Sequence, residues 1–472
     1  MHVAKKLFIK TYGCQMNVYD SARMADVLAP IGFTSCSEAG SADMIILNTC
    51  HIREKASEKV YSELGRLRHI KEKRLLDEEN TIIAVAGCVA QAEGEEILRR
   101  APYVDIVLGP QTYHRLPEMV ARAARAGDKK NTYGRGVLDT DFPTSQKFDH
   151  LPNESSFQGV SAFLSVQEGC DKFCTFCVVP YTRGAEFSRP VEQILNEAKR
   201  LVENGAKEII LLGQNVNAYH GLDEREKETS LGRLINRLSE VDGIERVRYT
   251  TSHPNDMNKD LILAHGQQKK LMPFLHLPVQ SGSNKILQSM NRRHSVESYL
   301  DIISDLRKSR PDMALSSDFI VGFPGESDED FEETIDLIKE VKFSQAYSFK
   351  YSVRPGTPAG SMAEQVPDEL KDERLFVLQD VLKKQQTEFN SSKVGKVLKV
   401  LLEKSGRHAS QLIGRSQYNQ AVHVNAPEYN LGSVQDVNID SVLSHTLQGS
   451  IKKYVKDIEV GQRSEKTQGE HV

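Results

Sequence analysis

Short apolar runs alternate with polar, helix-compatible stretches over the first 125 residues. The apolar runs have the composition of strands and read KKLFIKTYGC (5–14), ADMIILNTC (42–50) and TIIAVAGC (81–88). Stretches with helical spacing lie between them, such as REKASEKVYSELGRLRHIK (53–71). Strands that alternate with helices predict a parallel sheet, and right-handed crossovers bring the carboxyl ends of its strands to one edge. We therefore expect an α/β domain with a parallel sheet over residues 1–125.

The alternation stops over residues 126–157, where Gly, Pro, Asp, Ser and Asn mix with little periodicity. Such a composition is typical of a linker or a surface excursion. From about residue 160 the alternation resumes and gives about six strand–helix units before a long helix predicted near 367–390. This number of units predicts a partial or complete TIM-like barrel over residues 156–390, with a doubly wound open sheet as the alternative.

The pattern changes again over residues 391–456. Short apolar runs such as VGKVLKVLLEK (394–404) are separated there by Gly-containing turns. This spacing predicts a small antiparallel β-barrel. The last residues are polar, and we expect them to be frayed.

Composition narrows the class of protein. The chain has 472 residues, of which 39% are hydrophobic and none is Trp. No apolar run approaches the roughly 18 residues of a membrane-spanning helix, and the N-terminus lacks a long hydrophobic signal region. Net charge is −4, and residues 391–472 hold 11 Lys and Arg against 8 Asp and Glu, a weak basic tilt. We expect a cytoplasmic protein with no membrane association.

Seven cysteines are too few and too scattered for a disulfide scaffold, and a cytosolic setting would keep them reduced. Three of them, Cys170, Cys174 and Cys177, lie in GCDKFCTFCVVPYTRG directly after a predicted strand. Three thiolates on one loop can hold three irons of a [4Fe–4S] cluster, which leaves the fourth iron for a small chelating molecule. A zinc site usually requires a fourth Cys or His, and none stands close in the sequence.

Cys14, Cys50 and Cys88 are 36 and 38 residues apart, so no local spacing rule detects them. Each follows a predicted strand of the N-terminal sheet, and the carboxyl ends of parallel strands converge on one edge. Three thiolates gathered there could hold a second cluster. The alternative is three buried apolar cysteines. Cys36 falls outside this pattern.

The Cys170, Cys174 and Cys177 triplet resembles that of the radical S-adenosylmethionine (SAM) superfamily, whose open iron binds the amino and carboxylate groups of SAM. The resemblance implies that an electron from the cluster cleaves SAM to a 5′-deoxyadenosyl radical. DFIVGFPGE (318–326) and LLGQNV (211–216) resemble SAM-contacting regions of the superfamily.

Four residues are candidates for cofactor contact on this basis: Asn215, Asp318, Gly322 and Arg183. For Gly322 the alternative is a strand-to-helix turn with Ser327 as the helix N-cap. Arg183 could neutralise the SAM carboxylate or a phosphate, or it could pair with an acid such as Glu186.

TYGCQMN, ILNTCHIREKA and AVAGCVAQ, followed by GCDKFCTFCVVPYTRG, resemble the methylthiotransferase family over almost the whole chain. These are radical SAM enzymes with an auxiliary three-cysteine cluster. The resemblance implies an N-terminal cluster domain, a radical SAM barrel and a C-terminal TRAM β-barrel that binds RNA. It also implies two [4Fe–4S] clusters and SAM as cofactors, with Cys14, Cys50 and Cys88 as ligands of the auxiliary cluster.

SHPNDM, HLPVQSGSNKIL and MNRRHS resemble the branch of the family that adds a methylthio group to C2 of N6-isopentenyladenosine at position 37 of tRNA. Two SAM molecules are then consumed, one as methyl donor and one as radical source. Other branches act on threonylcarbamoyl-adenosine in tRNA or on a ribosomal protein aspartate. Residues 52–55 favour the first branch, and His51 departs from it. The expected partners are this tRNA, an electron donor and, unless a cluster sulfide is used, a sulfur donor.

No general base is expected, because hydrogen abstraction by a radical needs none, and His253, His276 and His294 are therefore not assigned to catalysis. For RNA contact the candidates are basic and aromatic side chains of the C-terminal barrel. They are Lys393, Lys396, Lys399, Lys404, Arg407, Arg415, Tyr418 and His423. The alternative is a solvated charged face. A non-catalytic iron–sulfur or zinc RNA-binding protein is the competing class.

Overall fold

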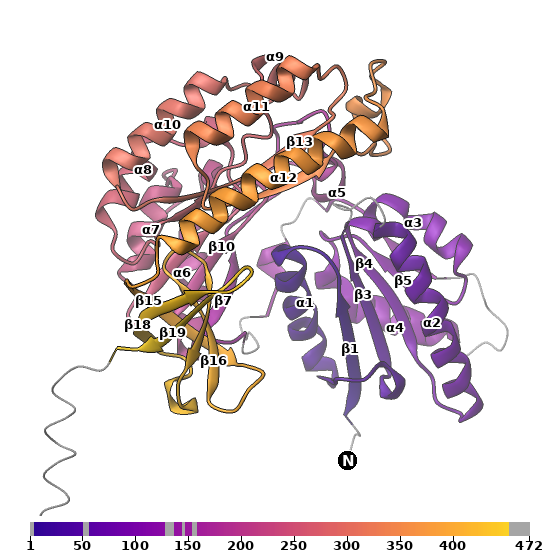
Figure 1. Cartoon of the computed structure of the whole chain (residues 1–472). Helices are drawn as coiled ribbons and strands as arrows, with labels where there is room; N and C mark the ends of the chain where they lie inside the picture. The colour runs from indigo at the N-terminus through magenta and orange to yellow at the C-terminus, as the bar shows by residue number, and fades with distance from the viewer. Residues whose placement is uncertain (1–3, 51–55, 128–135, 144–146, 153–157, 453–472) are drawn as a thin grey trace, which may run out of the picture.

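The computed structural model describes residues 4–50, 56–127, 136–143, 147–152 and 158–452. They form an N-terminal α/β domain, a partial barrel beside it and a small β-barrel below the partial barrel (Figure 1). The three-part α/β architecture expected from the sequence is thereby confirmed. Within these ranges, none of the helices combines the length and the apolar character needed to cross a membrane.

The N-terminal domain is built on one parallel sheet with strand order β2-β1-β3-β4-β5-β6. Its strands β3 and β4 are buried along nearly their whole length, because helices cover both faces of a parallel sheet. Helices α1 and α4 pack on one face, and α2 and α3 pack on the other. The elements are β1 (Lys5–Thr11), α1 (Gln15–Leu28), β2 (Phe33–Ser35), β3 (Met44–Thr49), α2 (Ala56–Leu76), β4 (Ile82–Gly87), α3 (Cys88–Arg100), β5 (Ile106–Leu108), α4 (Leu116–Gly127) and β6 (Val137–Asp139).

The segment 126–157, expected to be a linker or surface excursion, differs from that expectation where it is described. Strand β6 completes the N-terminal sheet beside β5, and a 3-10 turn, η4 (Lys147–His150), buries Lys147 and Phe148 between two domains. The sequence pattern misses both because a strand of three residues has no measurable period. A buried Lys is moreover predictable only once its carboxylate partners are known.

Six parallel strands of the middle domain follow one another in chain order, as in a barrel. Two three-stranded sheets, β7-β10-β11 and β12-β13-β14, are joined by a bridge between Val247 and Leu271. This order fits the partial TIM-like barrel. In a doubly wound sheet the spatial order of the strands would reverse near the middle of the sheet. The strands are β7 (Ser161–Ser165), β10 (Glu208–Leu212), β11 (Arg246–Tyr249), β12 (Phe274–His276), β13 (Ala314–Val321) and β14 (Gln345–Lys350).

Helices cover the outer face of this arc and enclose the largest hydrophobic core of the chain. The long helix α12 (Asp368–Ser391) runs along the barrel and packs on β14 (Figure 1). The other elements are β8 (Gln167–Glu168), α5 (Val179–Arg183), β9 (Phe187–Ser188), α6 (Val191–Glu203), α7 (Leu231–Ser239), α8 (Lys259–Gln267), α9 (Asn284–Ser289), α10 (Val296–Ser309) and α11 (Asp328–Val341).

The C-terminal domain is a closed five-stranded barrel with the order β15-β16-β17-β19-β18. All its pairings are antiparallel except that of β17 with β19. Alternate residues of its strands point inward and form a separate small core. The strands are β15 (Val397–Ser405), β16 (Gln411–Ser416), β17 (Ala421–Asn425), β18 (Val434–Val442) and β19 (Leu447–Ile451).

Two buried arginines on β11 attach the C-terminal barrel to the partial barrel. Arg246 donates to the carbonyls of Lys399 and Arg415, each at 2.9 Å. Arg248 donates to the carbonyls of Ser416 and Gln417 at 2.8 and 3.1 Å, and its Nε lies 2.8 Å from Glu208. Because these acceptors belong to the backbone, these four hydrogen bonds do not depend on the side chains of the small barrel.

Replacing Arg248 with Ala should therefore destabilise the chain more than a surface substitution does. Glu208 would keep a buried charge with one close partner fewer, which costs about 3 kcal/mol. Arg237→Ala is the matched control: Arg237 bridges Glu192 and Glu224 with a third of its side chain exposed, and its loss should cost at most about 1 kcal/mol. Urea unfolding followed by circular dichroism measures both, and equal effects would contradict the buried-anchor explanation.

Candidate functional site

Three cysteines meet at the carboxyl edge of the N-terminal sheet. Cys14 caps α1, Cys50 directly follows β3, and Cys88 begins α3 after β4. Strands β1, β3 and β4 are neighbours in the sheet, so the expected convergence of the three loops occurs. The Cys50 thiol hydrogen-bonds that of Cys14 and, against the effect of burial, lowers the pKa of Cys14 to about 6.

Glycine at two positions permits this close approach. Gly13 has φ +115°, and a Cβ there would lie 2.2 Å from the Cβ of Cys50. Gly87 has φ +92°, and a Cβ there would lie 2.3 Å from the carbonyl oxygen of Thr49. Both backbones adopt a conformation that only glycine takes without strain. The two glycines therefore allow the cysteine loops to lie in close contact. Cysteines that were only buried in the core would not require such close contact between the loops.

Cys170, Cys174 and Cys177 lie on one loop between β8 and α5. Asn291 holds this loop by donating to the carbonyls of Lys172 and Phe173 at 3.2 and 3.0 Å. The Arg292 guanidinium lies 3.7 Å from the Cys174 sulfur. Burial raises the pKa of Cys170 to about 11 and that of Cys177 to about 12.

Neither triplet has the arrangement of a single-ion site. Among the residues that the structure describes, no group of three or more His, Cys, Asp or Glu side chains is placed to hold one metal ion. A [4Fe–4S] cluster places each thiolate on a different iron, whereas tetrahedral zinc gathers its ligands around one point. The donors therefore fit a cluster at each triplet better than zinc, and the role of the six cysteines as ligands remains a prediction.

Asn215 lies beside the radical-type cysteine loop and keeps one unpaired polar atom. Its Nδ2 donates to Asp256 at 2.8 Å, and Asp256 accepts from Lys172 of the cysteine loop, also at 2.8 Å. Its Oδ1 is buried without a hydrogen-bond partner in the described structure. Because an unsatisfied buried acceptor is costly, this oxygen is suited to a ligand that donates, such as the amino group of SAM.

Asp318 lies within β13, and Gly322 directly follows the last residue of that strand. Asp318 lies 3.5 Å from the Nε2 of His276, toward the inner face of the partial barrel. The N–H of Gly322 donates to Glu326, and Ser327 caps α11. These contacts explain Gly322 by the turn alone, and a contact of either residue with SAM remains a prediction.

Arg183 does not pair with Glu186, in contrast to the alternative raised for it. Its guanidinium lies 2.7 Å from Asp20 and 2.6 Å from Glu168, both almost fully buried. Lys147 completes the group at 2.6 Å from Glu168. Sequence reasoning missed these partners, since they lie on three separate segments and no motif links them.

A cavity of about 520 Å³ separates the N-terminal cysteines from the partial barrel. Cys14 and Cys50 line one wall, and the inner face of the barrel lines the other. Asn419, in the turn between β16 and β17, reaches it from the C-terminal barrel. The barrel residues are Thr250, Thr251, Phe274, His276, Ser316, Tyr347 and Phe349. The period-two spacing of Phe274 with His276, and of Tyr347 with Phe349, is the one sequence signal that could have found this wall.

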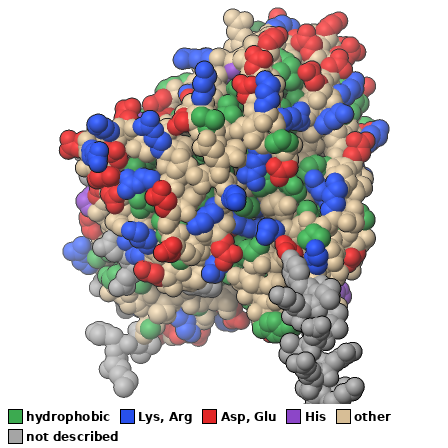
Figure 2. Space-filling view, turned by 90° about the vertical axis from the view of Figure 1, so that its left-hand side faces the viewer, with side chains coloured by type: hydrophobic (Ala, Val, Ile, Leu, Met, Phe, Trp, Pro, Cys, Tyr) green, Lys and Arg blue, Asp and Glu red, His purple; other side chains and the backbone are tan. Residues whose placement is uncertain are grey.

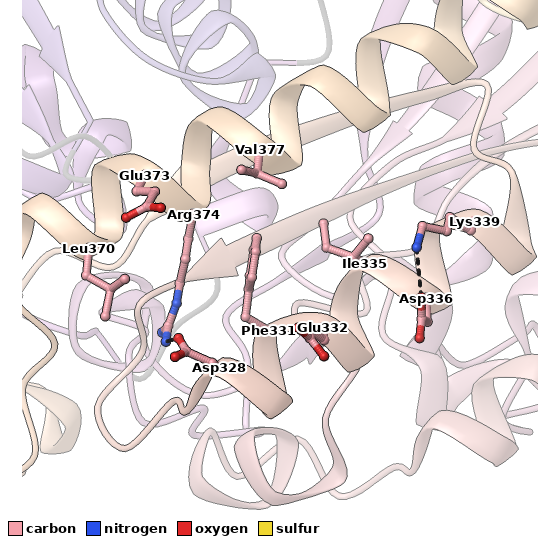
Figure 3. Close-up of a pocket in the computed structure, with 10 residues that line it drawn as sticks. All are labelled: Asp328, Phe331, Glu332, Ile335, Asp336, Lys339, Leu370, Glu373, Arg374 and Val377. Atoms are coloured by element: carbon pink, nitrogen blue, oxygen red, sulfur yellow. Dashed lines mark hydrogen bonds and ion pairs between the residues drawn. The ribbon is translucent and has the colours of Figure 1, made fainter.

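A second hollow lies between α11 and α12 on the outside of the barrel (Figure 3). It contains none of the cysteines and none of the strand ends. Arg374 points across it to Asp328 at 2.6 Å, and Lys339 pairs with Asp336 (Figure 3). The Arg374–Asp328 pair attaches α12 to α11, so we assign this hollow to packing.

The basic candidates for RNA contact divide into two groups. Lys393 is packed over the rings of Phe389 and Tyr418, and the Tyr418 hydroxyl donates to Asp312 of the partial barrel. By contrast, Lys396, Lys399, Lys404 and Arg407 are exposed. The face in Figure 2 shows basic and acidic side chains intermixed, so charge on that face forms no single-sign patch.

The histidines near the barrel mouth are poor proton carriers. Burial, aided by the charge of Arg292, lowers the pKa of His253 to about 2 and that of His294 to about 4. Both rings are therefore neutral at pH 7. This agrees with the absence of a histidine general base from the expected chemistry.

Three family models match consecutive parts of the chain. "Uncharacterized protein family UPF0004" matches residues 6–109, the "Radical SAM superfamily" matches 164–338, and the "TRAM domain" matches 391–452. The matches correspond in order to the N-terminal sheet, the partial barrel and the closed β-barrel.

Proteins similar to this chain over nearly its full length are called tRNA-2-methylthio-N(6)-dimethylallyladenosine synthase. The one from Rickettsia conorii is 57% identical over 451 residues, 95% of this chain and 100% of that protein. The one from Rickettsia felis is 56% identical with the same coverage. Among solved structures, the radical S-adenosylmethionine methyltransferase TsrM from Kitasatospora setae superimposes with a TM-score of 0.55 at 10% identity, covering 76% of this chain and 77% of that one. At that identity the match shows the fold alone.

Gly13→Ala should selectively weaken the N-terminal site. The added methyl group would force Cys50 away, so anaerobically reconstituted protein should lose about four of the roughly eight irons expected for two [4Fe–4S] clusters. Gly32→Ala is the control, because Gly32 also has a left-handed backbone, φ +90°, but open space around its Cα. Iron and acid-labile sulfide assays measure the loss. Full iron content in Gly13→Ala would show that the close approach of the two loops is not needed.

Proposed function

This chain belongs to the family of tRNA-2-methylthio-N(6)-dimethylallyladenosine synthases, and from that premise we propose that it adds a methylthio group to C2 of N6-isopentenyladenosine at position 37 of tRNA. The observation that carries the proposal is the cavity in which two N-terminal cysteines face the inner wall of the radical SAM barrel. A base held there would lie between two of the proposed auxiliary-cluster cysteines and the inner wall of the barrel that carries the other triplet. The competing class, a non-catalytic RNA-binding protein, does not account for this shared cavity.

The cofactors of the reaction are two [4Fe–4S] clusters and SAM. When bound, they supply a radical able to open the C2–H bond of adenine and the methylthio group that replaces the hydrogen. We assign one cluster to Cys14, Cys50 and Cys88, and the other to Cys170, Cys174 and Cys177. The unpaired Oδ1 of Asn215 then accepts a hydrogen bond from the amino group of SAM.

The lining of the cavity favours the isopentenyl base over its threonylcarbamoyl counterpart. Phe274, Tyr347 and Phe349 present aromatic surface, on which a base unstacked from the anticodon loop can lie. An apolar isopentenyl chain fits against such rings. A threonylcarbamoyl group carries a carboxylate, which would lose hydration against the same rings.

The C-terminal barrel is the proposed binding surface for the tRNA. Asn419 at the edge of the cavity belongs to the C-terminal barrel, so RNA bound on that barrel lies next to the entry. The exposed Lys396, Lys399, Lys404 and Arg407 are the proposed phosphate contacts.

We propose an electron donor as a further partner of the protein. The sulfur comes either from a cluster sulfide or from an external donor, and the proposed location is the cytoplasm. We divide the chain at 1–125, 156–390 and 391–456.

The two triplets should be separable by mutation. Cys174→Ala should abolish release of 5′-deoxyadenosine, because it removes a ligand from the cluster that binds SAM. Cys50→Ala should retain that release and lose the methylthio product. The control is Cys36→Ala, since Cys36 lies in neither triplet. Liquid chromatography with mass detection of both products measures the effects, and methylthio product from Cys50→Ala would refute the auxiliary role.

The substrate is tested in cells that lack this protein. Nucleosides from their tRNA should lack the 2-methylthio-isopentenyl form and accumulate N6-isopentenyladenosine. Expression of the wild-type chain should restore the modified form, and expression of Cys174→Ala should not. Loss of the methylthio-threonylcarbamoyl form instead would transfer the assignment to the other tRNA branch.

A further inference from the structure

The wall of the cavity contains a strained backbone position. Thr251 lines the cavity just beyond β11 and has φ +64°. Among the described residues other than Gly that have a positive φ, it is the only β-branched one. Asn419, which lines the same cavity at φ +65°, is of a type that adopts this conformation readily. For a β-branched residue the left-handed region is a genuine outlier, and such strain concentrates at functional sites.

Contacts with the loop after β10 hold the strained segment in place. They come from the 3-10 turn η5 (Val216–Ala218). The N–H of Val216 donates to the carbonyl of Thr251 at 2.8 Å. Two residues further along, the Asn217 side chain accepts from the N–H of His253 and donates to its carbonyl, each at 2.8 Å. The segment could not relax to a negative φ without giving up these bonds, which is the condition under which strain persists.

This conformation leaves a hydroxyl group at the surface of the cavity. Thr251 is exposed, and its Oγ1 lies 3.3 Å from the Oγ1 of Thr250, which also lines the cavity. One hydroxyl donates to the other, so this contact uses one of the two hydroxyl hydrogens. Within the part of the chain that the structure describes, the second hydrogen has no acceptor. The threonine pair can therefore donate a hydrogen bond to a ligand in the cavity.

Stacking and hydrogen bonding constrain a bound base in different ways. The rings of Phe274, Tyr347 and Phe349 can hold the plane of an adenine. Every base has such a face, however, and stacking leaves the base free to turn within its plane. The reacting carbon C2 lies between two ring nitrogens, N1 and N3, and both accept hydrogen bonds. A directional donor to either nitrogen fixes where C2 points.

We propose that the Thr250 and Thr251 pair donates a hydrogen bond from Thr251 to a ring nitrogen beside C2, and that this bond directs C2 toward the radical. The proposal rests on the proposed function for the identity of the base. Thr251 is then a substrate contact that decides which atom of the base reacts. This role accounts for a strained conformation that a residue needed only for packing would not require.

The test follows deuterium from C2 of the base. The reconstituted full-length chain is given an anticodon stem–loop RNA that carries C2-deuterated N6-isopentenyladenosine. The 5′-deoxyadenosine formed gains deuterium only when the radical takes the hydrogen atom of C2. Thr251→Val removes the hydroxyl and keeps the branched side chain. It should lower methylthio product about 10-fold, the effect of one hydrogen bond, while 5′-deoxyadenosine is still released with a smaller deuterium fraction.

Three further variants separate the hydroxyl from the backbone. Thr251→Ser keeps the hydroxyl and should retain product within about 3-fold of wild type. Thr251→Gly removes the hydroxyl together with the strain, so it should melt no lower than wild type and yet lose as much product as Thr251→Val. Glu78→Gly is the matched control, because Glu78 has φ +61° in the exposed turn after α2 and does not line the cavity. It should keep full product and the wild-type deuterium fraction.

Wild-type product and deuterium transfer in Thr251→Val would overturn the proposal. Equal losses in Thr251→Ser and Thr251→Val would do so too, since they would indicate packing in place of a hydrogen bond. If Thr251→Val does not fold, Thr251→Gly decides, and full product from that variant contradicts the proposal. Failure of the proposed function is distinct. A wild-type chain that makes no methylthio product from this RNA refutes the function, whereas wild-type product beside an unaffected Thr251→Val refutes only the role of Thr251.

Discussion

The candidate site depends on contact between the N-terminal domain and the partial barrel, at the carboxyl ends of their parallel strands. The buried group of Asp20, Lys147, Glu168 and Arg183 provides this contact at the point where the cysteine loops meet. Burying four charges is expensive unless each finds its partner, so the domains fit in one register or lose that compensation. A neighbouring apolar cluster that includes Met16, Tyr19 and Leu212 contributes buried apolar area to this interface. The charged side chains fix how the two domains align.

Buried arginines paired with a carboxylate also attach the C-terminal barrel to the partial barrel. Arg246 and Arg248 bind backbone carbonyls of that barrel and share Glu208 as their acid. Backbone acceptors leave the exposed side chains of the barrel free to change, and a surface for RNA requires that freedom. In this position the turn between β16 and β17 reaches the cavity, which Asn419 lines. The C-terminal barrel thereby contributes to the wall of the cavity.

Much of the fold could be predicted from local pattern. The alternation of strands and helices predicted the parallel sheet of the N-terminal domain, whereas both a partial barrel and a doubly wound sheet fitted the pattern of the middle domain. The pattern failed where elements are short or where burial depends on a distant partner. Strand β6 has three residues, and η4 is buried because Lys147 meets Glu168. Residues 52–55, which favoured one branch of the family, lie outside the described residues, as does His51.

The sequence by itself determined which groups are the candidates for the chemistry: three cysteines on one loop, and three more that each follow a strand of one parallel sheet. Spacing and strand order are local properties, so they can be read along the chain. Only the tertiary structure decided that Cys14 and Cys50 face the barrel across a cavity lined by Phe274, Tyr347 and Phe349. It also placed the Arg183 guanidinium between the buried carboxylates of Asp20 and Glu168. Such pairings join segments far apart in sequence, and the strength of a charge pair is set by burial, which no linear pattern records.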